Sequence, residues 1–573
     1  MQRPIYTQAD NCQDCYKCIR ECPVKAVRIE DNKAYIIDDR CIYCGHCTQI
    51  CPTGAKKIRD GLSRAQSVLR KYPDVDVYLS LAPSYISEFE GISPSKIVAA
   101  IKHLGFAGVS ETALGAEIVS VRTEDFLNSS EKSIYISSAC PVVVDYIRKY
   151  SPDYTANVTP IISPMLAHAK ILKELYGDNI RVIFAGPCIG KKTEADKFSE
   201  LIDVVMTFKD LKKWFEQEDI NPQDDIWDKQ DEKFVPYRSR LGSRYPIEGG
   251  MLDGLHKSAK PVFYMAFSDL PTIKDVLKNI ESNSYSDTIF LELLACKGGC
   301  VNGPAKLNST SLAIKRYEII QQSEMGDPAE DFKNLDLKTL FEEDVQKENC
   351  YTEDEIKQAL FRVGKVNPED ELNCSSCGYD SCRDFAVAML ESRAEDNMCV
   401  SYMRKIAHDK ATVLLQKIPA GVLLINSDLK IVDMNRRCAF LLGQDIVDIY
   451  EVCPGLNGAL LSNICTFDNL FKTVLATGKE IKERQIKEND KTWILSIYNI
   501  QPHRQVFGLL QDLQNPSVKK EWIIEKTREV IKNHMSTVQQ VASLLGENAA
   551  FTDSVLRAVI DVYDKDENKK IFL

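Results

Sequence analysis

Two short segments of this chain repeat the same dense arrangement of cysteines. Residues 12–22 read CQDCYKCIREC, residues 41–51 read CIYCGHCTQIC, and a proline follows each segment. Both have the spacing C-x2-C-x2-C-x3-C-P, in which a tight loop can place three thiolates on three corners of one metal cluster while the proline turns the chain away. The N-terminal part of the chain is therefore predicted to fold around metal clusters.

The spacing resembles that of bacterial two-cluster ferredoxins, in which the fourth cysteine of each motif binds the other cluster. The resemblance implies a ferredoxin domain over residues 1–59 with two 4Fe-4S clusters. Site 1 would then be held by Cys12, Cys15, Cys18 and Cys51, and site 2 by Cys41, Cys44, Cys47 and Cys22. A zinc ribbon is the alternative, but it would use only four of these cysteines.

Length, cysteine usage and charge narrow the class of protein. A chain of 573 residues is too long for one core and should hold several domains. Sixteen of its twenty cysteines fall into ligand patterns and its first residues lack an apolar signal-peptide core, so we expect a cytoplasmic protein. No run of about eighteen apolar residues suggests a membrane span. The net charge of −11 disfavours nucleic acid as a partner.

Between residues 60 and 348 the pattern changes to apolar runs separated by helical stretches. The runs are VYLSLAP (77–83), SIYISSAC (133–140), RVIFAGPC (181–188) and TIFLELLAC (288–296). Such continuous apolar runs are typical of buried parallel strands. Three of them end at a cysteine, and loops at the carboxyl ends of parallel strands form ligand-binding crevices. The pattern predicts an α/β domain that brings these distant cysteines together.

Three segments of this domain resemble iron-only (FeFe) hydrogenases: SSACP (137–141), GPCIGKK (186–192) and ELLACKGGC (292–300). The resemblance implies an H-cluster, which is a 4Fe-4S cubane joined to a two-iron unit carrying carbon monoxide, cyanide and an azadithiolate. Its ligands, here called the H-site, would be Cys140, Cys188, Cys296 and Cys300, with Cys300 as the bridging thiolate.

The same resemblance implies a pocket that holds the two-iron unit by hydrogen bonds and packing. Lys191 matches the family lysine that donates to a cyanide nitrogen, and Glu194 completes the motif KKTE. Pro83 and Ser84 match a segment that contacts the other cyanide, and Ser163 belongs to the segment facing the distal iron. For Lys191 and Glu194 the alternative is a solvated helix start.

Other positions depart from the family pattern. Catalytic members have a cysteine, the terminal proton carrier, where this chain has Ala139. Arg122 and Thr123 stand where we expect the first of the next carriers, which are glutamates, although Glu124 is nearby. His168 could replace part of this route, but a hydrogen-bonded structural histidine is the simpler interpretation. The final motif reads CVNGP without the family's glycine triplet. These departures predict slow turnover.

A further cysteine group lies in residues 349–405. The segment LNCSSCGYDSCRDFAVAMLESRAEDNMC (372–399) resembles a small four-cysteine iron-sulfur domain of anaerobic redox proteins. The resemblance implies a third accessory 4Fe-4S cluster at site 3, held by Cys374, Cys377, Cys382 and Cys399. Structural zinc is the alternative, because four thiolates alone do not choose the metal.

Beyond Cys399 the pattern changes to a connector and a sensory-type module. Met403, Ile406, Lys410 and Val413 keep a three-four spacing, which fits a helix paired with its copy in a homodimer or packed on its own domain. Residues 406–515 resemble a PAS domain, with the hairpin GVLLIN and KIVDMN and two closing strands, KTWILSIYNIQP and VFGLLQDL.

The C-terminal residues 516–573 are expected to form a helical tail without a kinase pattern, so a separate signalling protein would make any output. Four cysteines lie outside the ligand patterns: Cys350, Cys438, Cys453 and Cys465. The last three belong to the PAS-like region and are expected to be core thiols, with redox sensing as the alternative.

Together these patterns predict a multidomain protein of α/β and α+β parts that resembles a sensory FeFe hydrogenase. Its expected activity is slow, reversible oxidation of dihydrogen to protons and electrons, with a redox partner such as ferredoxin. One alternative is a conventional ferredoxin-linked catalytic hydrogenase. The other is a non-catalytic iron-sulfur scaffold that carries the cubane without the two-iron unit.

Overall fold

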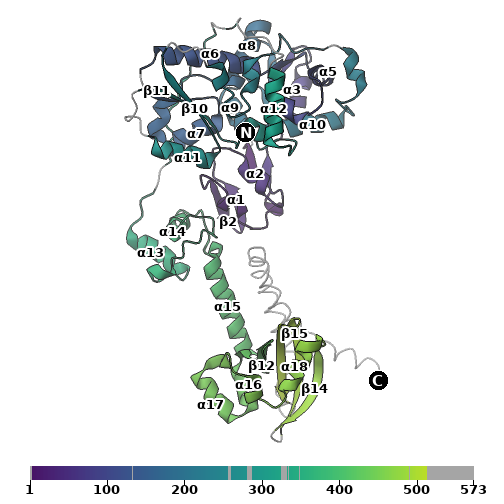
Figure 1. The fold of residues 1–573 in the computed structure, drawn as a ribbon, viewed down its shortest axis with the longest axis vertical. Helices are drawn as coiled ribbons and strands as arrows, with labels where there is room; N and C mark the ends of the chain where they lie inside the picture. The colour runs from purple at the N-terminus through teal and green to yellow at the C-terminus, as the bar shows by residue number, and fades with distance from the viewer. Residues whose placement is uncertain are drawn as a thin grey trace. The chain divides into compact units, whose positions relative to one another are not determined.

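The computed structural model divides the chain into two compact units (Figure 1). The first comprises Met1–Lys357 and Asn373–Ala394, and the second comprises Gln358–Leu372 and Glu395–Leu573. The unit boundary therefore passes through the stretch 349–405. The described residues are 3–131, 133–230, 232–255, 260–280, 287–323, 332, 335–346, 349–488 and 491–512.

The N-terminal module of the first unit is built on two small antiparallel pairs. Strand β1 (Ile5–Thr7) pairs with β4 (Lys56–Ile58), and β2 (Val27–Glu30) pairs with β3 (Lys33–Ile36). Each cysteine motif carries a short helix, α1 (Lys17–Arg20) or α2 (His46–Ile50), that follows a residue in the left-handed region, Tyr16 (φ 53°) or Gly45 (φ 79°). The repeated sequence therefore folds twice into the same tight loop.

The central domain contains two parallel sheets. Strands β6 (Gly108–Glu111), β5 (Val77–Leu81), β8 (Arg181–Gly186) and β9 (Val204–Thr207) form the first in that order. Strands β10 (Val262–Ser268), β11 (Thr288–Leu294) and β7 (Ile134–Ile136) form the second. The four apolar runs are confirmed as parallel strands, and they divide equally between the sheets.

Helices cover these sheets and bury their apolar strands (Figure 1). Thr207 and Asp210 form a capping box at the start of α10 (Phe208–Gln217), and Ser93 caps α5 (Pro94–His103). Helix α6 (Ala113–Ser129) packs closely on α8 (Pro164–Tyr176), since a Cβ on Gly115 would lie 2.3 Å from the Pro164 carbonyl oxygen. The other helices of the domain are α3 (Leu62–Lys71), α4 (Tyr85–Glu88), α7 (Pro141–Tyr150), α9 (Gly190–Lys197), α11 (Leu270–Asn279) and α12 (Leu312–Ser323).

Two helices flank the third group of cysteines. Helix α13 (Glu353–Arg362) precedes it, and α14 (Cys382–Leu390) begins at one of the cysteines. Ser381 accepts a hydrogen bond from the Asp384 amide while the Asp384 carboxylate accepts one from the Ser381 amide, which is a capping box. The loop before α14 is thus fixed by local side-chain chemistry.

The second unit contains the connector helix α15 (Val400–Lys417) and a five-stranded antiparallel sheet. The sheet order is β13 (Ile431–Met434), β12 (Gly421–Asn426), β16 (Gln505–Asp512), β15 (Lys491–Gln501) and β14 (Ile481–Glu488). The hairpin and both closing strands follow the sequence prediction, whereas the charged β14 was not predicted. Helices α16 (Arg436–Leu442), α17 (Gln444–Val452) and α18 (Asp468–Thr477) accompany this sheet. The predicted tail at 516–573 and the side chains of Lys410 and Val413 lie outside the described residues.

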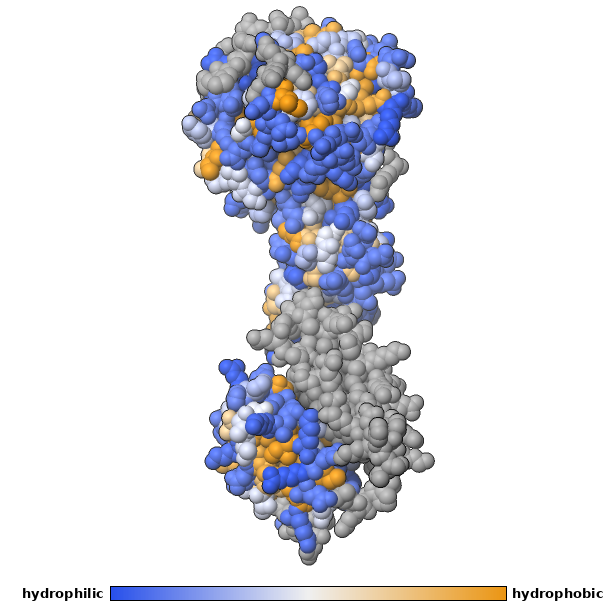
Figure 2. All heavy atoms as spheres, turned by 90° about the vertical axis from the view of Figure 1, so that its right-hand side faces the viewer, coloured by the Kyte–Doolittle hydropathy of each residue, from blue (hydrophilic) through white to orange (hydrophobic). Residues whose placement is uncertain are grey.

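On the coloured part of the surface in Figure 2, hydrophilic residues predominate and small groups of hydrophobic residues lie between them. Within the described ranges, no helix combines the length and the apolar composition needed to cross a membrane.

Candidate metal centre

The four H-site cysteines lie on loops that follow strands of both parallel sheets. Cys140 follows β7 and is the residue before α7, while Cys188 comes two residues after the end of β8. Cys296 and Cys300 follow β11. The ligand loops therefore come from two sheets, so neither sheet alone could form this centre.

Close backbone contacts fix these loops against one another. The Ala305 amide donates to the Pro187 carbonyl oxygen at 3.0 Å, which ties the segment after Cys300 to the segment before Cys188. Gly299 has φ 108°, and a Cβ there would lie 2.3 Å from the Pro246 carbonyl oxygen. Only glycine satisfies both the conformation and the space at this position.

Burial and mutual repulsion disfavour ionised thiols at the H-site. Burial raises the pKa of Cys188 to about 11, with a further rise from Cys140, while Lys191 opposes the shift. The pKa values of Cys296 and Cys300 are also raised, first by burial and then by the other cysteines of the group. Because iron binds thiolates, positively charged iron would supply the compensation that four buried thiolates need. The donor set fits a thiolate-bound cluster.

Lys191 connects most of the predicted pocket residues. Its ammonium donates to Ser163 Oγ at 2.8 Å, to Glu194 Oε2 at 2.8 Å and to the Ala139 carbonyl oxygen at 3.5 Å. The residue is only 9% exposed, so the alternative of a solvated helix start is wrong for Lys191. A buried cation held beside Cys188 can stabilise an anionic group bound there.

The predicted Pro83–Ser84 segment lies at the carboxyl end of β5, next to the Cys188 loop. The Ala82 amide donates to the Ala185 carbonyl oxygen at 2.9 Å, and a Cβ on Gly186 would lie 2.9 Å from the Ala82 side chain. Ser84 itself is only 1% exposed. The chain therefore places this segment against the strand that delivers Cys188.

Glu292 is a buried acid that the sequence analysis missed. Its Oε1 accepts a hydrogen bond from the Met251 amide at 3.2 Å, and its Oε2 has no partner in the described part of the chain. Burial raises its pKa to about 8, and its charge raises the pKa of Cys300. A single carboxylate inside the apolar strand TIFLELL was the available signal, because such a charge is costly to bury without a role.

The residues considered for the outer proton route make other contacts. Thr123 is buried and donates to the Val119 carbonyl oxygen at 2.7 Å, while Arg122 donates to the Leu335 carbonyl oxygen at 3.0 Å. His168 is fully buried, with Nδ1 2.8 Å from Ser80 Oγ and Nε2 2.8 Å from Ser110 Oγ. Burial lowers its pKa to about 3, so the ring is neutral near pH 7. His168 fits the structural interpretation.

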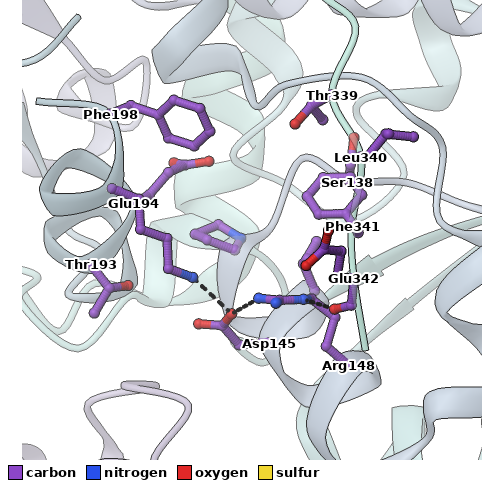
Figure 3. Close-up of a pocket in the computed structure, with 13 residues that line it drawn as sticks. Ser138, Asp145, Arg148, Thr193, Glu194, Phe198, Thr339, Leu340, Phe341 and Glu342 are labelled. Atoms are coloured by element: carbon purple, nitrogen blue, oxygen red, sulfur yellow. Dashed lines mark hydrogen bonds and ion pairs between the residues drawn. The ribbon is translucent and has the colours of Figure 1, made fainter. Parts of the chain in front are cut away.

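A pocket of about 230 Å³ is lined by Ser138 and Pro141, on either side of Cys140 in the sequence (Figure 3). Its lining includes Glu194, the partner of Lys191, and an ion-paired row in which Lys197 and Arg148 lie 3.5 and 3.4 Å from Asp145. The Arg148 Nε also donates to the Glu342 carbonyl oxygen. Glu194 therefore joins the buried Lys191 to a pocket with charged walls.

Cysteines of the ferredoxin-like module lie close enough to affect one another. The pKa of Cys18 is raised by burial and by Cys12, Cys15 and Cys22, and that of Cys44 by burial and by Cys22 and Cys188. The assignment of the eight cysteines to site 1 and site 2 stays a prediction. Among the described residues, no three potential ligands converge as they do around a single metal ion. A cubane instead spreads its four thiolates over separate corners.

The other cysteines separate into two kinds. Cys374, Cys377 and Cys382 belong to the first unit and Cys399 to the second, so the complete ligand set of site 3 stays a prediction. Cys438 and Cys465 are buried in the core of the second unit, as expected, whereas the expectation of a core thiol is wrong for Cys453, which is exposed. Cys350 is exposed as well.

Comparison with known proteins identifies three regions of this chain. Residues 75–304 match the family model "Iron only hydrogenase large subunit, C-terminal domain", and residues 9–55 match the "4Fe-4S dicluster domain". Residues 370–401 match the model "Putative Fe-S cluster". The central domain is thus of the iron-only hydrogenase type, and the N-terminal module is an iron-sulfur module.

Solved structures with similarity to the chain include hydrogenases and sensory domains. The FeFe-hydrogenase HydA1 from Chlamydomonas reinhardtii has 16% identity and a TM-score of 0.39, over 49% of this chain and 100% of that chain. The photoactive yellow protein domain of the sensor histidine kinase Ppr from Rhodospirillum centenum has 18% identity and a TM-score of 0.14, over 18% and 92%. The PAS domain of an HTR-like protein from Haloarcula marismortui has 15% identity and a TM-score of 0.15, over 19% and 99%.

The number of clusters can be measured by iron analysis. Anaerobic reconstitution without the two-iron unit should give about sixteen irons per chain, four for each of four cubanes. Replacing Cys374 with alanine should lower the total to about twelve. A parent total near twelve that Cys374→Ala leaves unchanged would mean that site 3 holds zinc or no metal.

Proposed function

We propose that this protein is a sensory FeFe hydrogenase that oxidises dihydrogen reversibly and slowly. In this proposal Cys140, Cys188, Cys296 and Cys300 hold an H-cluster, and three accessory 4Fe-4S clusters receive its electrons. The match of residues 75–304 to the iron-only hydrogenase domain supports an oxidoreductase acting on hydrogen. The slow rate and the sensory role rest on Ala139 and on the PAS-like second unit.

The observation that carries the proposal is the buried Lys191 with its partners Ser163 and Glu194. A bare cubane presents only thiolates and sulfides and has no cyanide for the ammonium group to hold, whereas a two-iron unit carries cyanide. Lys191 lies close enough to Cys188 and Cys300 to lower their pKa values. In the scaffold alternative this cation would only stabilise the ligand thiolates, and no cyanide would accept its hydrogen bond.

Different residues of the chain would have different roles at the H-site. The two-iron unit, when bound, supplies the metal that splits dihydrogen. Lys191 would donate a hydrogen bond to a cyanide, with Glu194 holding the ammonium in place from the other side. Ser163, Pro83 and Ser84 would complete the walls that keep the unit in position. Ala139 would leave the first proton-transfer step without a titratable side chain.

The sensory role requires that the H-site state changes the second unit. Cys399 directly precedes Val400, the first residue of α15, and α15 leads into the sheet of the PAS-like module. The proposed partners are dihydrogen and protons as substrates, a ferredoxin-type redox protein, and a separate signalling protein. Pairing of α15 with its copy would give a homodimer. The H-site would be coupled to the signalling protein if the chain had two states that differ in their affinity for dihydrogen or for that protein.

Infrared spectroscopy of the matured protein tests the proposed cofactor. We expect bands from metal-bound carbon monoxide and cyanide that change when dihydrogen is added. Lys191→Met should shift the cyanide bands, because the methionine side chain cannot donate to them. A matured protein without such bands, or with bands that do not change when dihydrogen is added, would favour the alternative of a non-catalytic scaffold.

Deleting residues 406–573 should leave the chemistry of dihydrogen largely unchanged. Every proposed ligand lies before residue 406, and the second unit is compact in its own right. The measurement is the infrared response to dihydrogen in the truncated and full-length proteins at equal loading of the two-iron unit. Loss of that response on truncation would show that residues 406–573 belong to the active-site fold.

A further inference from the structure

The loop that carries Cys377 touches the helix that carries Cys18. Gly378 has φ 95°, and a Cβ there would lie 2.9 Å from Ile19 Cγ2 and 3.0 Å from the Arg20 amide nitrogen. Ile19 directly follows Cys18. Although about 360 residues separate them in sequence, the backbones that present ligands of site 1 and site 3 are in direct contact.

Two additional contacts between these segments hold this arrangement. The Ile29 amide donates to the Arg393 carbonyl oxygen at 3.0 Å, which ties β2 to the segment after α14. Arg40 lies 3.3 Å from Glu391, and the two side chains are 20% and 7% exposed. Glu391 is also paired with Arg393 at 2.5 Å. Residues 373–394 are thus fixed to the ferredoxin-like module within the first unit.

At its other end the ferredoxin-like module contacts the H-site. A Cβ on Gly45 would lie 2.6 Å from both Ile189 Cδ1 and Pro304 Cβ. Gly45 directly follows Cys44 of site 2, Ile189 directly follows Cys188, and Pro304 belongs to the loop after Cys300. Site 2 is therefore the accessory site whose loop packs against the H-site loops.

One turn of chain joins the two sites of the module. Cys18 belongs to the ligand set of site 1 and Cys22 to that of site 2, and the Cys22 amide donates to the Ile19 carbonyl oxygen at 3.2 Å. Ile19 therefore takes part in the contact with the Cys377 loop and in the turn that leads to Cys22. The ligand-bearing loops are thus in contact in the order H-site, site 2, site 1 and site 3, and the Arg40–Glu391 pair additionally holds the segment after α14 beside the start of the site 2 loop.

We infer that electrons from dihydrogen reach site 3 only through site 2 and then site 1, so that site 3 is the last member of the relay. The inference rests on the proposed function and adds the order. Oxidation of one dihydrogen releases two protons and two electrons, and each 4Fe-4S cluster accepts one electron. The two electrons therefore reduce two clusters of the relay by one electron each. The two protons leave to solvent.

This order gives site 3 a specific role. Its proposed fourth ligand, Cys399, is the residue before α15, whereas the ligands of sites 1 and 2 all lie within residues 12–51. Reduction of the last cluster would thus change the charge at a ligand continuous with the connector helix. The cluster farthest along the relay is the one joined in sequence to the sensory module.

Removing individual sites tests the order by electron paramagnetic resonance. The matured full-length protein is exposed to dihydrogen as the sole reductant, and the signals of the reduced accessory clusters are recorded over time. In a Cys12→Ala/Cys15→Ala variant, which lacks site 1, the site 2 signal should appear at the parental rate. The site 3 signal should appear at least about a hundredfold more slowly, yet still form fully with a small chemical reductant.

The matched control removes the other end of the relay. A Cys374→Ala/Cys377→Ala variant should lose only the site 3 signal and keep the parental reduction of sites 1 and 2. Reduction of site 3 at the parental rate in the variant without site 1 would overturn the proposed order. Loss of site 1 and site 2 reduction in the variant without site 3 would overturn it as well.

A second measurement does not depend on the two-iron unit. In protein reduced chemically without that unit, the signals of sites 1 and 3 should broaden each other through spin coupling. Removing site 1 should narrow the site 3 signal, and unaltered line shapes would contradict the contact. If dihydrogen reduces no cluster in the parent, the proposed function fails, and the spin coupling still decides the order.

Discussion

Replacing Ala139 with cysteine should raise the rate of dihydrogen turnover by at least about tenfold. Loss of a proton carrier next to the reacting group commonly costs about 10²–10⁴-fold when that carrier acts in the limiting step. The parent should therefore bind and split dihydrogen while turning over slowly. The gain from one restored carrier should be partial, because Thr123 donates its hydroxyl to Val119 and Arg122 offers no carboxylate.

The experiment compares turnover at matched loading of the two-iron unit. Ala139→Cys combined with Arg122→Glu should exceed Ala139→Cys alone, since it restores a second titratable group. Ala139→Ser is the matched control, because a hydroxyl of similar size has too high a pKa to relay a proton efficiently. Fast turnover in the unmodified protein would refute the slow-sensor proposal and favour the conventional catalytic hydrogenase.

Replacing Lys315 with methionine should destabilise the central domain by about 3–5 kcal/mol, the usual cost of leaving one buried charge unpaired. Lys315 and Glu88 form an ion pair at 3.1 Å, and both side chains are 0% exposed. Lys315 also donates to the Val301 carbonyl oxygen at 3.0 Å, immediately after Cys300. The same variant should therefore shift the carbon monoxide and cyanide bands.

Two comparison variants make this result specific. Lys315→Met combined with Glu88→Gln should recover much of the lost stability, because no unpaired charge remains. Asp225→Asn removes a carboxylate that is 98% exposed in its pair with Lys96, and it should cost less than about 1 kcal/mol. The readout is the denaturant midpoint of the anaerobic protein. If Lys315→Met alone were as stable as the parent, the role assigned to the Lys315–Glu88 ion pair would be wrong.

Much of the metal chemistry could be predicted because cysteine spacing is a local property. The repeated motif at residues 12–22 and 41–51 was predicted to form two equivalent loops, and Tyr16 and Gly45 adopt the same left-handed conformation at equivalent positions. The parallel strands were also predictable, since strands buried on both faces are apolar throughout. The positions of Lys191, Ser163 and Glu194 followed from short motifs near those strands.

Other features depend on contacts between distant parts of the chain. Glu88 and Lys315 look like ordinary charged residues in sequence, and only packing reveals that both are buried. Likewise, the space for a side chain at Gly378 is limited by Ile19, about 360 positions away in the sequence. Local spacing cannot encode such pairs, because their energies arise from desolvation and steric fit between elements that meet only in the folded domain.

The sequence by itself determined which cysteines are grouped as candidate cluster ligands and which modules follow one another, since ligand type, spacing and apolar runs act over a few residues. The tertiary structure alone decided that the H-site draws on two sheets, that Lys191 is buried among its partners, and that the loop of site 3 packs on site 1. The physical reason is range: the spacing of cysteines within a motif is fixed by covalent geometry, whereas contacts between distant segments arise only when the folded modules pack.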